Sequence, residues 1–225
     1  MDILNIISNI GIIPVIKIND AKKAVPLAKA LIEGGLPAAE VTFRTDAAEE
    51  AIRAIADACP DMIVGAGTVL TIDQAERALK AGAKFIVSPG FNPKVVKWCL
   101  DNGVTPLPGC TTPSEIEQAL ELGLKVVKFF PAEQSGGLAK IKAMAAPYVN
   151  MKFMPTGGIN AKNINSYLDF PKIIACGGSW MVPGDFINAG EWDKIEQLTR
   201  EAVQTMLGFE LAHVGINAEN EEDAS

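Results

Sequence analysis

Lys128 is the residue whose sequence neighbours most favour a role in catalysis. It lies late in the apolar run VVKFFP at residues 126–131. An amine among large apolar side chains is desolvated, and desolvation favours its neutral, nucleophilic form, which attacks carbonyl carbon. Such a lysine can instead extend from a strand end to solvent, or form half of a salt bridge. Spacing alone leaves these interpretations open. Lys17 is the rival lysine, but it has no aromatic neighbours and ranks below Lys128.

A carboxylate and a guanidinium alternate with apolar residues in a second run, AEVTFR at residues 39–44. Side chains alternate across a strand, so Glu40, Thr42 and Arg44 share one face. Four residues of strand span roughly 13 Å, which places Arg44 at the rim and Glu40 deeper inside. A buried carboxylate is costly unless it is paired or functional, so Glu40 either forms an ion pair with Lys128 or transfers protons beside it.

Glycine pairs follow the last two apolar runs, in PTGGI at residues 155–159 and CGGSW at residues 176–180. Turns use glycine freely, so the pairs alone are weak signals. Their position is more informative, because the loops after the seventh and eighth strands of a barrel commonly hold phosphate with backbone N–H groups near a helix N-terminus. Ser179 adds a hydroxyl group there, and Arg44 adds charge. Two tight strand-to-helix turns are the alternative interpretation.

These segments belong to a repeated unit of aliphatic run, turn and helical segment. The alternation predicts parallel strands joined by crossover helices, and eight units close a (β/α)8 TIM barrel. A doubly wound open sheet is the alternative, and residues 2–10 are predicted to form a short helix that caps the barrel bottom. The predicted strands are 12–18, 39–43, 62–65, 85–88, 104–107, 126–129, 152–155 and 173–175. The predicted helices are 21–33, 47–58, 72–81, 93–102, 113–122, 138–145, 161–168 and 191–206.

Composition and length fit one such domain. Hydrophobic residues make up 48% of the chain but aromatic residues only 6%, which suits an aliphatic core of strands buried on both faces. Residues 1–207 are therefore predicted to form the barrel, and residues 208–225 an acidic extension. The LAHVGI segment of the extension resembles the opening strand of a glyoxalase-type module, of which it would be a remnant. A solvated tail is the alternative.

Charge and residue usage argue against several classes of function. The net charge of −7 and the lack of clustered Lys and Arg argue against nucleic-acid binding, and no apolar stretch is long enough to span a membrane. The four cysteines form no C-x-x-C pair, and no signal-like N-terminus is evident, so we expect a cytoplasmic protein with reduced thiols. The single histidine, His213, lies near the C-terminus. We therefore expect no metal and no cofactor in the barrel.

Eight motifs occur in order between residues 5 and 207: IIPVI, EVTFRT, GAGTVLT, SPGFNP, PGCTTPSE, KFFPAE, PTGGI and GGSW. Together they resemble the 2-keto-3-deoxy-6-phosphogluconate (KDPG) aldolases, also described as 4-hydroxy-2-oxoglutarate (KHG) aldolases. The resemblance implies a homotrimeric (β/α)8 barrel that cleaves a phosphorylated 2-oxo acid. KDPG would give pyruvate and glyceraldehyde 3-phosphate, and KHG would give pyruvate and glyoxylate.

The resemblance implies a class I mechanism carried by two residues. Lys128 of KFFPAE would attack the C2 carbonyl and form a protonated imine, which is an electron sink. Glu40 of EVTFRT would take the C4 hydroxyl proton through a water, so that the C3–C4 bond breaks and leaves an enamine of pyruvate. Phe43 and Cys110 stand where other side chains are expected, but neither touches this chemistry.

The resemblance also assigns residues to substrate binding. Arg44 would contact an anionic group of the substrate, and Thr68 and Thr156 would line the pyruvate end. Pro89 of the SPGFNP motif is also assigned to substrate binding. The residues expected to hold the phosphate are Gly157, Gly158, Gly178 and Ser179.

Three other functions fit parts of the pattern. A 2-dehydro-3-deoxy-6-phosphogalactonate aldolase would use the same chemistry on a stereoisomer. A sugar-phosphate isomerase or epimerase, or a non-catalytic barrel that binds phosphometabolites, would keep the phosphate loops. Neither of these would need a nucleophilic lysine beside Glu40. Among the aldolase substrates, the phosphorylated six-carbon acid is expected to be preferred.

Overall fold

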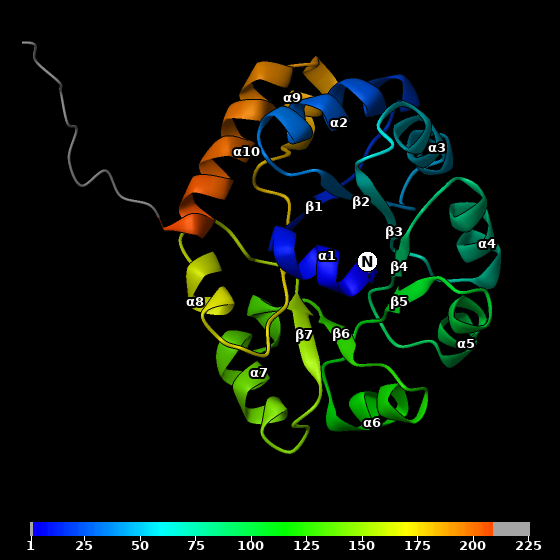
Figure 1. Cartoon of the computed structure of the whole chain (residues 1–225), viewed down its shortest axis with the longest axis vertical. Coiled ribbons are helices and arrows are strands. Elements are labelled where there is room, and N and C mark those ends of the chain that lie inside the picture. The colour runs from blue at the N-terminus through cyan, green and yellow to red at the C-terminus, as the bar shows by residue number, and fades with distance from the viewer. Residues whose placement is uncertain (1, 209–225) are drawn as a thin grey trace, which may run out of the picture.

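Parallel strands and helices alternate along the whole of residues 2–208, which are the residues that this computed structural model describes (Figure 1). Every strand pairing is parallel, so the α/β class expected from the sequence is confirmed. The strands are β1 (Ile12–Ile16), β2 (Ala38–Thr42), β3 (Ile63–Gly67), β4 (Phe85–Val87), β5 (Thr105–Leu107), β6 (Val126–Phe129), β7 (Lys152–Pro155) and β8 (Cys176–Gly178).

The strands form two sheets, and their edge strands meet at two places, here called seams. Six strands pair in the order β5-β4-β3-β2-β1-β8, and β6 pairs with β7. At the first seam, the Lys128 N–H donates to the Pro108 carbonyl at 2.9 Å, and the Cys110 N–H donates to the Lys128 carbonyl at 2.8 Å. At the second, the Ile174 N–H donates to the Phe153 carbonyl at 3.1 Å. Isolated bridges, rather than continuous ladders, therefore connect the two sheets into a ring.

Helices surround the strands, and one helix covers the end of the ring (Figure 1). Thr112 and Glu115 form a capping box that starts the helix at residues 113–121. The helices are α1 (Ile3–Ile10), α2 (Ala24–Glu33), α3 (Ala48–Ala58), α4 (Ile72–Lys80), α5 (Pro93–Asp101), α6 (Pro113–Glu121), α7 (Gly137–Ala145), α8 (Ile164–Leu168), α9 (Gly184–Ala189) and α10 (Trp192–Leu207), with 3-10 turns η1 (Ala21–Lys23) and η2 (Glu133–Ser135).

The core has an inner and an outer part because successive strand residues point to opposite faces. The outer part lies between the strands and the surrounding helices. The inner part fills the N-terminal end of the ring, and α1 closes it with the fully buried Ile7, as the predicted capping helix should. Its other members are Ile13, Ala38, Phe85, Val87, Leu107, Val126, Met154, Ile174 and Ala175. The apolar filling of this end leaves polar interior residues to the C-terminal end.

The structure corrects the predicted position of the last strand. The aliphatic pattern placed it at residues 173–175, but β8 begins at Cys176, which pairs with Ile12 of β1. The two glycines that were expected in the following loop therefore lie inside the strand. A Cβ at Gly177 would overlap the Thr156 side chain, and one at Gly178 would overlap the Trp180 ring. Close packing around the strand, rather than β-propensity, decides its residues.

Smaller differences from the prediction include two boundaries and one additional helix. The first strand ends at Ile16 rather than at residue 18, the helix predicted at 161–168 begins only at Ile164, and α9 was not predicted. The predicted glyoxalase-type remnant lies in residues 209–225, outside the described residues. Within residues 2–208, no helix has the length and apolarity needed to cross a membrane.

Candidate active site

Lys128 and Glu40 face each other across the interior of the ring. Lys128 Nζ lies 3.3 Å from Glu40 Oε1, and the two side chains are only 6% and 1% exposed. They come from β6 and β2, which are not neighbours in either ladder, so the pair spans the barrel. Lys17, the rival lysine, is exposed one residue beyond β1. Glu40 therefore lies inside the ring beside Lys128, as the alternation of side chains along its strand predicts.

The Glu40 carboxylate is incompletely paired. Oε1 accepts the hydrogen bond from Lys128, whereas Oε2 is buried and has no partner among the described residues. A buried acceptor without a donor is costly, and such groups are found at sites that bind or react. The side chain lies directly over Gly67 of β3, where a Cβ would overlap the carboxylate. Gly67 lies in the GAGTVLT motif.

Thr68 and Pro89 lie at the ends of neighbouring strands. Thr68 has a φ of 56°, which places a β-branched residue in the left-handed region. Such strained backbone tends to occur at functional sites. The Pro89 carbonyl lies so close to Gly109 that a Cβ there would overlap it, and Gly109 forms the bridge to Lys128. Pro89 is thus separated from the lysine strand by one glycine.

Arg44 is oriented by a threonine that sequence analysis placed on the same face without giving it a role. Arg44 Nε donates to Thr42 Oγ1 at 3.0 Å, and the same Thr42 hydroxyl donates to the Ile16 carbonyl of β1 at 2.8 Å. Thr42 is fully buried. Within residues 2–208 the Arg44 guanidinium forms no ion pair, so its terminal nitrogens are available to an anion. The position of Thr42 between Glu40 and Arg44 was the available signal.

A cleft of ≈ 180 Å³ opens beside Arg44 at the C-terminal ends of β7 and β8. It brings together six of the eight residues assigned to substrate binding. The other two, Thr68 and Pro89, do not line it. The lining residues are Val15, Arg44, Phe130, Thr156, Gly157, Gly158, Ile159, Gly177, Gly178 and Ser179. Thr156 Oγ1 is buried and has no partner among the described residues.

Residues 157–159, here called the glycine turn, present backbone donors at this cleft. Gly157 and Gly158 have φ values of 103° and 79°, conformations that a residue with a side chain rarely adopts. In the described part of the chain, the N–H groups of the glycine turn donate to no protein atom. Successive N–H groups in such a turn form an anion-binding concavity. The donors were expected near a helix N-terminus, but α8 begins only at Ile164, so the turn itself supplies them.

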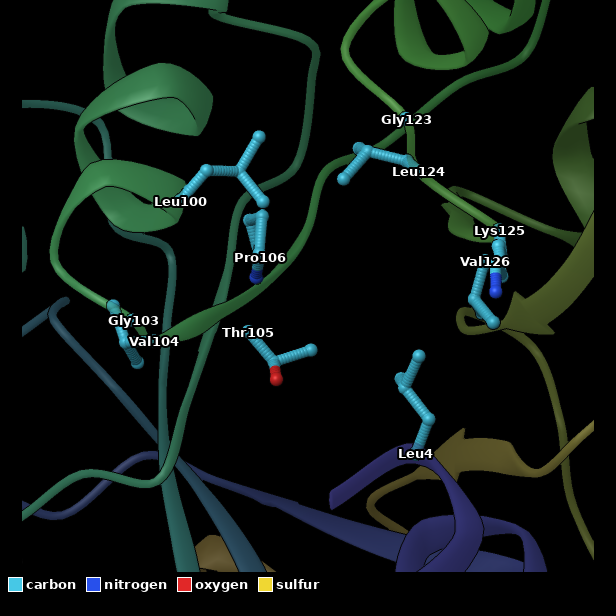
Figure 2. Close-up of a pocket in the computed structure, with 10 residues that line it drawn as sticks. All are labelled: Leu4, Leu100, Gly103, Val104, Thr105, Pro106, Gly123, Leu124, Lys125 and Val126. Atoms are coloured by element: carbon cyan, nitrogen blue, oxygen red, sulfur yellow. The ribbon is translucent and has the colours of Figure 1, made fainter. Parts of the chain in front are cut away.

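A separate apolar pocket of ≈ 290 Å³ lies at the opposite end of the barrel (Figure 2). Leu4 of α1 and the starts of β5 and β6 line it, and Lys125 is its one ionisable side chain. It contains no carboxylate, so it lacks the acid–base pair that Lys128 and Glu40 form at the C-terminal end. Across residues 2–208, no group of three His, Cys, Asp or Glu side chains is placed to hold a metal ion.

The family model described as "Aldolase: KDPG and KHG aldolase" matches residues 3–198, which include every strand. The chain belongs to the KDPG and KHG aldolase family. It is therefore an aldolase, an enzyme that makes or breaks a carbon–carbon bond. The paired lysine and carboxylate at the C-terminal ends of its strands lie where barrel enzymes hold their active sites.

Relatives of this aldolase cover nearly all of the chain. The 2-dehydro-3-deoxy-phosphogluconate aldolase of Treponema pallidum is 50% identical over 90% of this chain and 96% of its own length. The KHG/KDPG aldolase of Escherichia coli K12 is 45% identical over 86% and 91%. The KDPG aldolase of Legionella pneumophila, captured with pyruvate as a covalent carbinolamine, has a TM-score of 0.86 and 37% identity over 89% and 98%. A KDPG aldolase of Zymomonas mobilis, solved with 3-phosphoglycerate, has a TM-score of 0.82 and 39% identity over 89% and 94%.

Proposed function

We propose that this aldolase cleaves 2-dehydro-3-deoxy-6-phosphogluconate to pyruvate and glyceraldehyde 3-phosphate through a Schiff base on Lys128. One observation carries the proposal: Lys128 and Glu40 are the one buried lysine and the one buried carboxylate within residues 2–208, and they contact each other. The names of the relatives support the substrate, and the covalent pyruvate adduct of the Legionella enzyme supports the chemistry.

The geometry suits each step of a class I aldol cleavage. Lys128 Nζ attacks the C2 carbonyl to give a carbinolamine, which loses water and becomes a protonated imine. Glu40 then takes the C4 hydroxyl proton through a water, and its Oε2 has lone pairs that no described protein group uses. The electrons of the C3–C4 bond move to the imine, which releases the aldehyde and leaves an enamine. Protonation at C3 and hydrolysis release pyruvate and free Lys128.

The cleft beside Arg44 accounts for the phosphate. The glycine turn offers backbone N–H groups, Ser179 offers a hydroxyl group, and Arg44 offers charge. A substrate without the phosphate forgoes these hydrogen bonds, each worth about 1.5–3 kcal/mol when it is made to a charged group. We therefore propose that KDPG is the preferred substrate, and that 4-hydroxy-2-oxoglutarate is cleaved to pyruvate and glyoxylate with lower kcat/KM.

Borohydride trapping tests the mechanism. Reduction in the presence of pyruvate should attach one three-carbon group, and peptide mapping should find it on Lys128. Lys128→Met should abolish the adduct, and the control Lys17→Met should retain it. An adduct on Lys17 would overturn the assignment to Lys128, and a protein that is never trapped would overturn the Schiff-base mechanism.

Two finer points complete the proposal. The relatives that are 42–50% identical are named for phosphogluconate or for KHG/KDPG, so we expect a higher kcat/KM for KDPG than for the phosphogalactonate stereoisomer. The family resemblance implies a homotrimer. Sedimentation equilibrium should then give three times the 23.9 kDa mass of the chain.

A further inference from the structure

We propose that Tyr167 and Glu133 form a clamp that fixes the glycine turn and thereby sets the preference for a phosphorylated substrate. The proposal rests on the proposed function, because it concerns the same cleft. Neither residue lines the cleft or touches the Lys128–Glu40 pair. Both are positioning residues, and they act through the backbone of residues 157–159.

The clamp is a hydrogen bond between two elements on either side of the turn. The Tyr167 hydroxyl of α8 donates to Glu133 Oε1 of η2, and the Tyr167 side chain is buried. Burial and the Glu133 carboxylate together raise the pKa of Tyr167, so the phenol remains a donor throughout the neutral range. A hydrogen bond to a carboxylate is stronger than one between neutral groups. The bond therefore ties α8, which follows the glycine turn, to η2, which follows the strand that bears Lys128.

Glu133 also contacts the turn directly. A Cβ at Gly158 would lie 2.6 Å from Glu133 Cγ, so the stem of this side chain packs against the turn. The backbone makes the same connection, since the Glu133 N–H donates to the Gly157 carbonyl at 3.1 Å and the Ala132 N–H donates to the Thr156 carbonyl at 2.8 Å. A shift of Glu133 would therefore move Gly157 and Gly158.

The remaining carbonyl of the glycine pair is held from the other side. Asn160 Nδ2 and Asn163 Nδ2 both donate to the Gly158 carbonyl at 3.0 Å. With the Gly157 and Gly158 carbonyls thus engaged, the N–H groups of the turn are the ones left for a ligand. Fixing donors in advance lowers the cost of ordering them around an anion, which is how preorganisation increases affinity.

The position of the clamp predicts which kinetic step it affects. The imine forms on Lys128 of β6, whereas the turn follows β7 and contacts only the phosphate end. Loss of the clamp should therefore raise KM for the phosphorylated substrate and leave trapping by pyruvate and borohydride unchanged. A role in folding alone would lower thermal stability without changing the ratio between two substrates.

Substitutions at the two residues test the clamp. Tyr167→Phe removes only the hydroxyl, and Glu133→Ala removes the acceptor. Each should lower the ratio of kcat/KM for KDPG to that for 4-hydroxy-2-oxoglutarate by roughly tenfold, as expected for one lost hydrogen bond to a charged group. Glu133→Gln keeps an acceptor and should restore much of the ratio. The double variant Tyr167→Phe/Glu133→Ala should lose no more than the larger single loss.

The chain contains a matched control. Tyr148, its other tyrosine, also donates a hydrogen bond to a glutamate, Glu117 Oε1 at 3.0 Å, but neither of these two residues lines the cleft. Tyr148→Phe should leave the substrate ratio unchanged. An equal change in the Tyr148→Phe and Tyr167→Phe variants would overturn the proposal, and so would an unchanged ratio in both Tyr167→Phe and Glu133→Ala.

A binding measurement separates the clamp from the identity of the substrate. Inorganic phosphate should bind the wild-type protein and bind Tyr167→Phe more weakly, as measured by calorimetry. Equal affinity would overturn the clamp. A wild-type protein that fails to cleave KDPG but still shows this difference would overturn the proposed substrate and support the clamp.

Discussion

The Glu40 carboxylate can lie where it does because Gly67 has no side chain. The side chain occupies the space over Gly67 that a Cβ would fill, and it lies there with one oxygen paired to Lys128 and the other unpaired. A charge so deeply buried is stabilised by its ion pair, and removal of either partner leaves the other uncompensated. The charged residues and the small residue beside them therefore form one unit.

We expect Gly67→Ala to slow cleavage although it changes no charged group. The added methyl group would displace the Glu40 carboxylate from Lys128, and a displacement of about 1 Å can cost roughly 10²-fold in rate. The measurement is kcat on the six-carbon substrate. Gly184→Ala, where a Cβ meets nothing within 4 Å, is the control and should retain wild-type kcat. Wild-type activity in Gly67→Ala would show that Glu40 tolerates displacement.

Glu40→Gln separates proton transfer from packing. The amide has the same shape but cannot accept the C4 hydroxyl proton, so cleavage should slow by about 10²–10⁴-fold. Borohydride trapping by pyruvate should persist in part, because Lys128 remains the nucleophile. Single-turnover cleavage and trapping, measured on the same preparation, give the two rates. Near-wild-type cleavage would make Glu40 a structural partner of Lys128.

At the scale of elements, hydrophobic periodicity predicted the fold. It could not predict the features that depend on close packing between residues far apart in sequence. The aliphatic repeats located seven strands within a few residues, and alternation placed Glu40 inside. The same pattern misplaced β8, because Gly177 and Gly178 carry no apolar signal and enter the strand only through pairing with β1. The clamp of Tyr167 and Glu133 was likewise unpredicted. It joins residues 34 positions apart whose contact depends on how α8 packs.

The hydrogen bonds of Thr42, at the end of β2, lead to a prediction at the same scale. Thr42 links Arg44 to the Ile16 carbonyl of β1, so Thr42→Val should remove both of these side-chain hydrogen bonds and free the guanidinium. We expect KM for the phosphorylated substrate to rise by roughly three- to tenfold, the effect of one lost hydrogen bond. Thr42→Ser keeps the hydroxyl group and should retain the wild-type KM. A wild-type KM in Thr42→Val would show that Arg44 is positioned by other contacts.

At the scale of the whole molecule, the two ends of the barrel differ in chemistry. Helix α1 and an apolar cluster close the N-terminal end, whereas the C-terminal end holds the ion pair, Arg44 and the glycine turn. A chain with a net charge of −7 thus places Arg44, Lys128 and the backbone donors of the glycine turn at one end. Because stability and chemistry lie at opposite ends, substitutions in the cleft should affect catalysis more than folding.

The buried thiols make the free energy of unfolding depend on pH in the alkaline range. Burial raises the pKa of Cys99 to about 11 and that of Cys110 and Cys176 to about 12, from an ordinary value of 9.0. Above pH 9 the unfolded chain loses thiol protons that the folded protein keeps. The unfolded state then binds fewer protons, so the free energy of unfolding falls as pH rises. The stability is fully present below pH 9 and is lost as pH approaches the raised pKa values.

Cys99→Ala isolates the contribution of one thiol. Between pH 9 and pH 11, the free energy of unfolding should fall more steeply in the wild type than in the variant, by about 1.4 kcal/mol per pH unit. Urea denaturation of the wild type and the variant at pH 8, 9, 10 and 11 measures the two slopes. The cavity left by the variant shifts its curve by a constant amount and does not change the slope. Parallel curves above pH 9 would mean that the Cys99 thiol ionises in the folded protein as readily as in the unfolded chain.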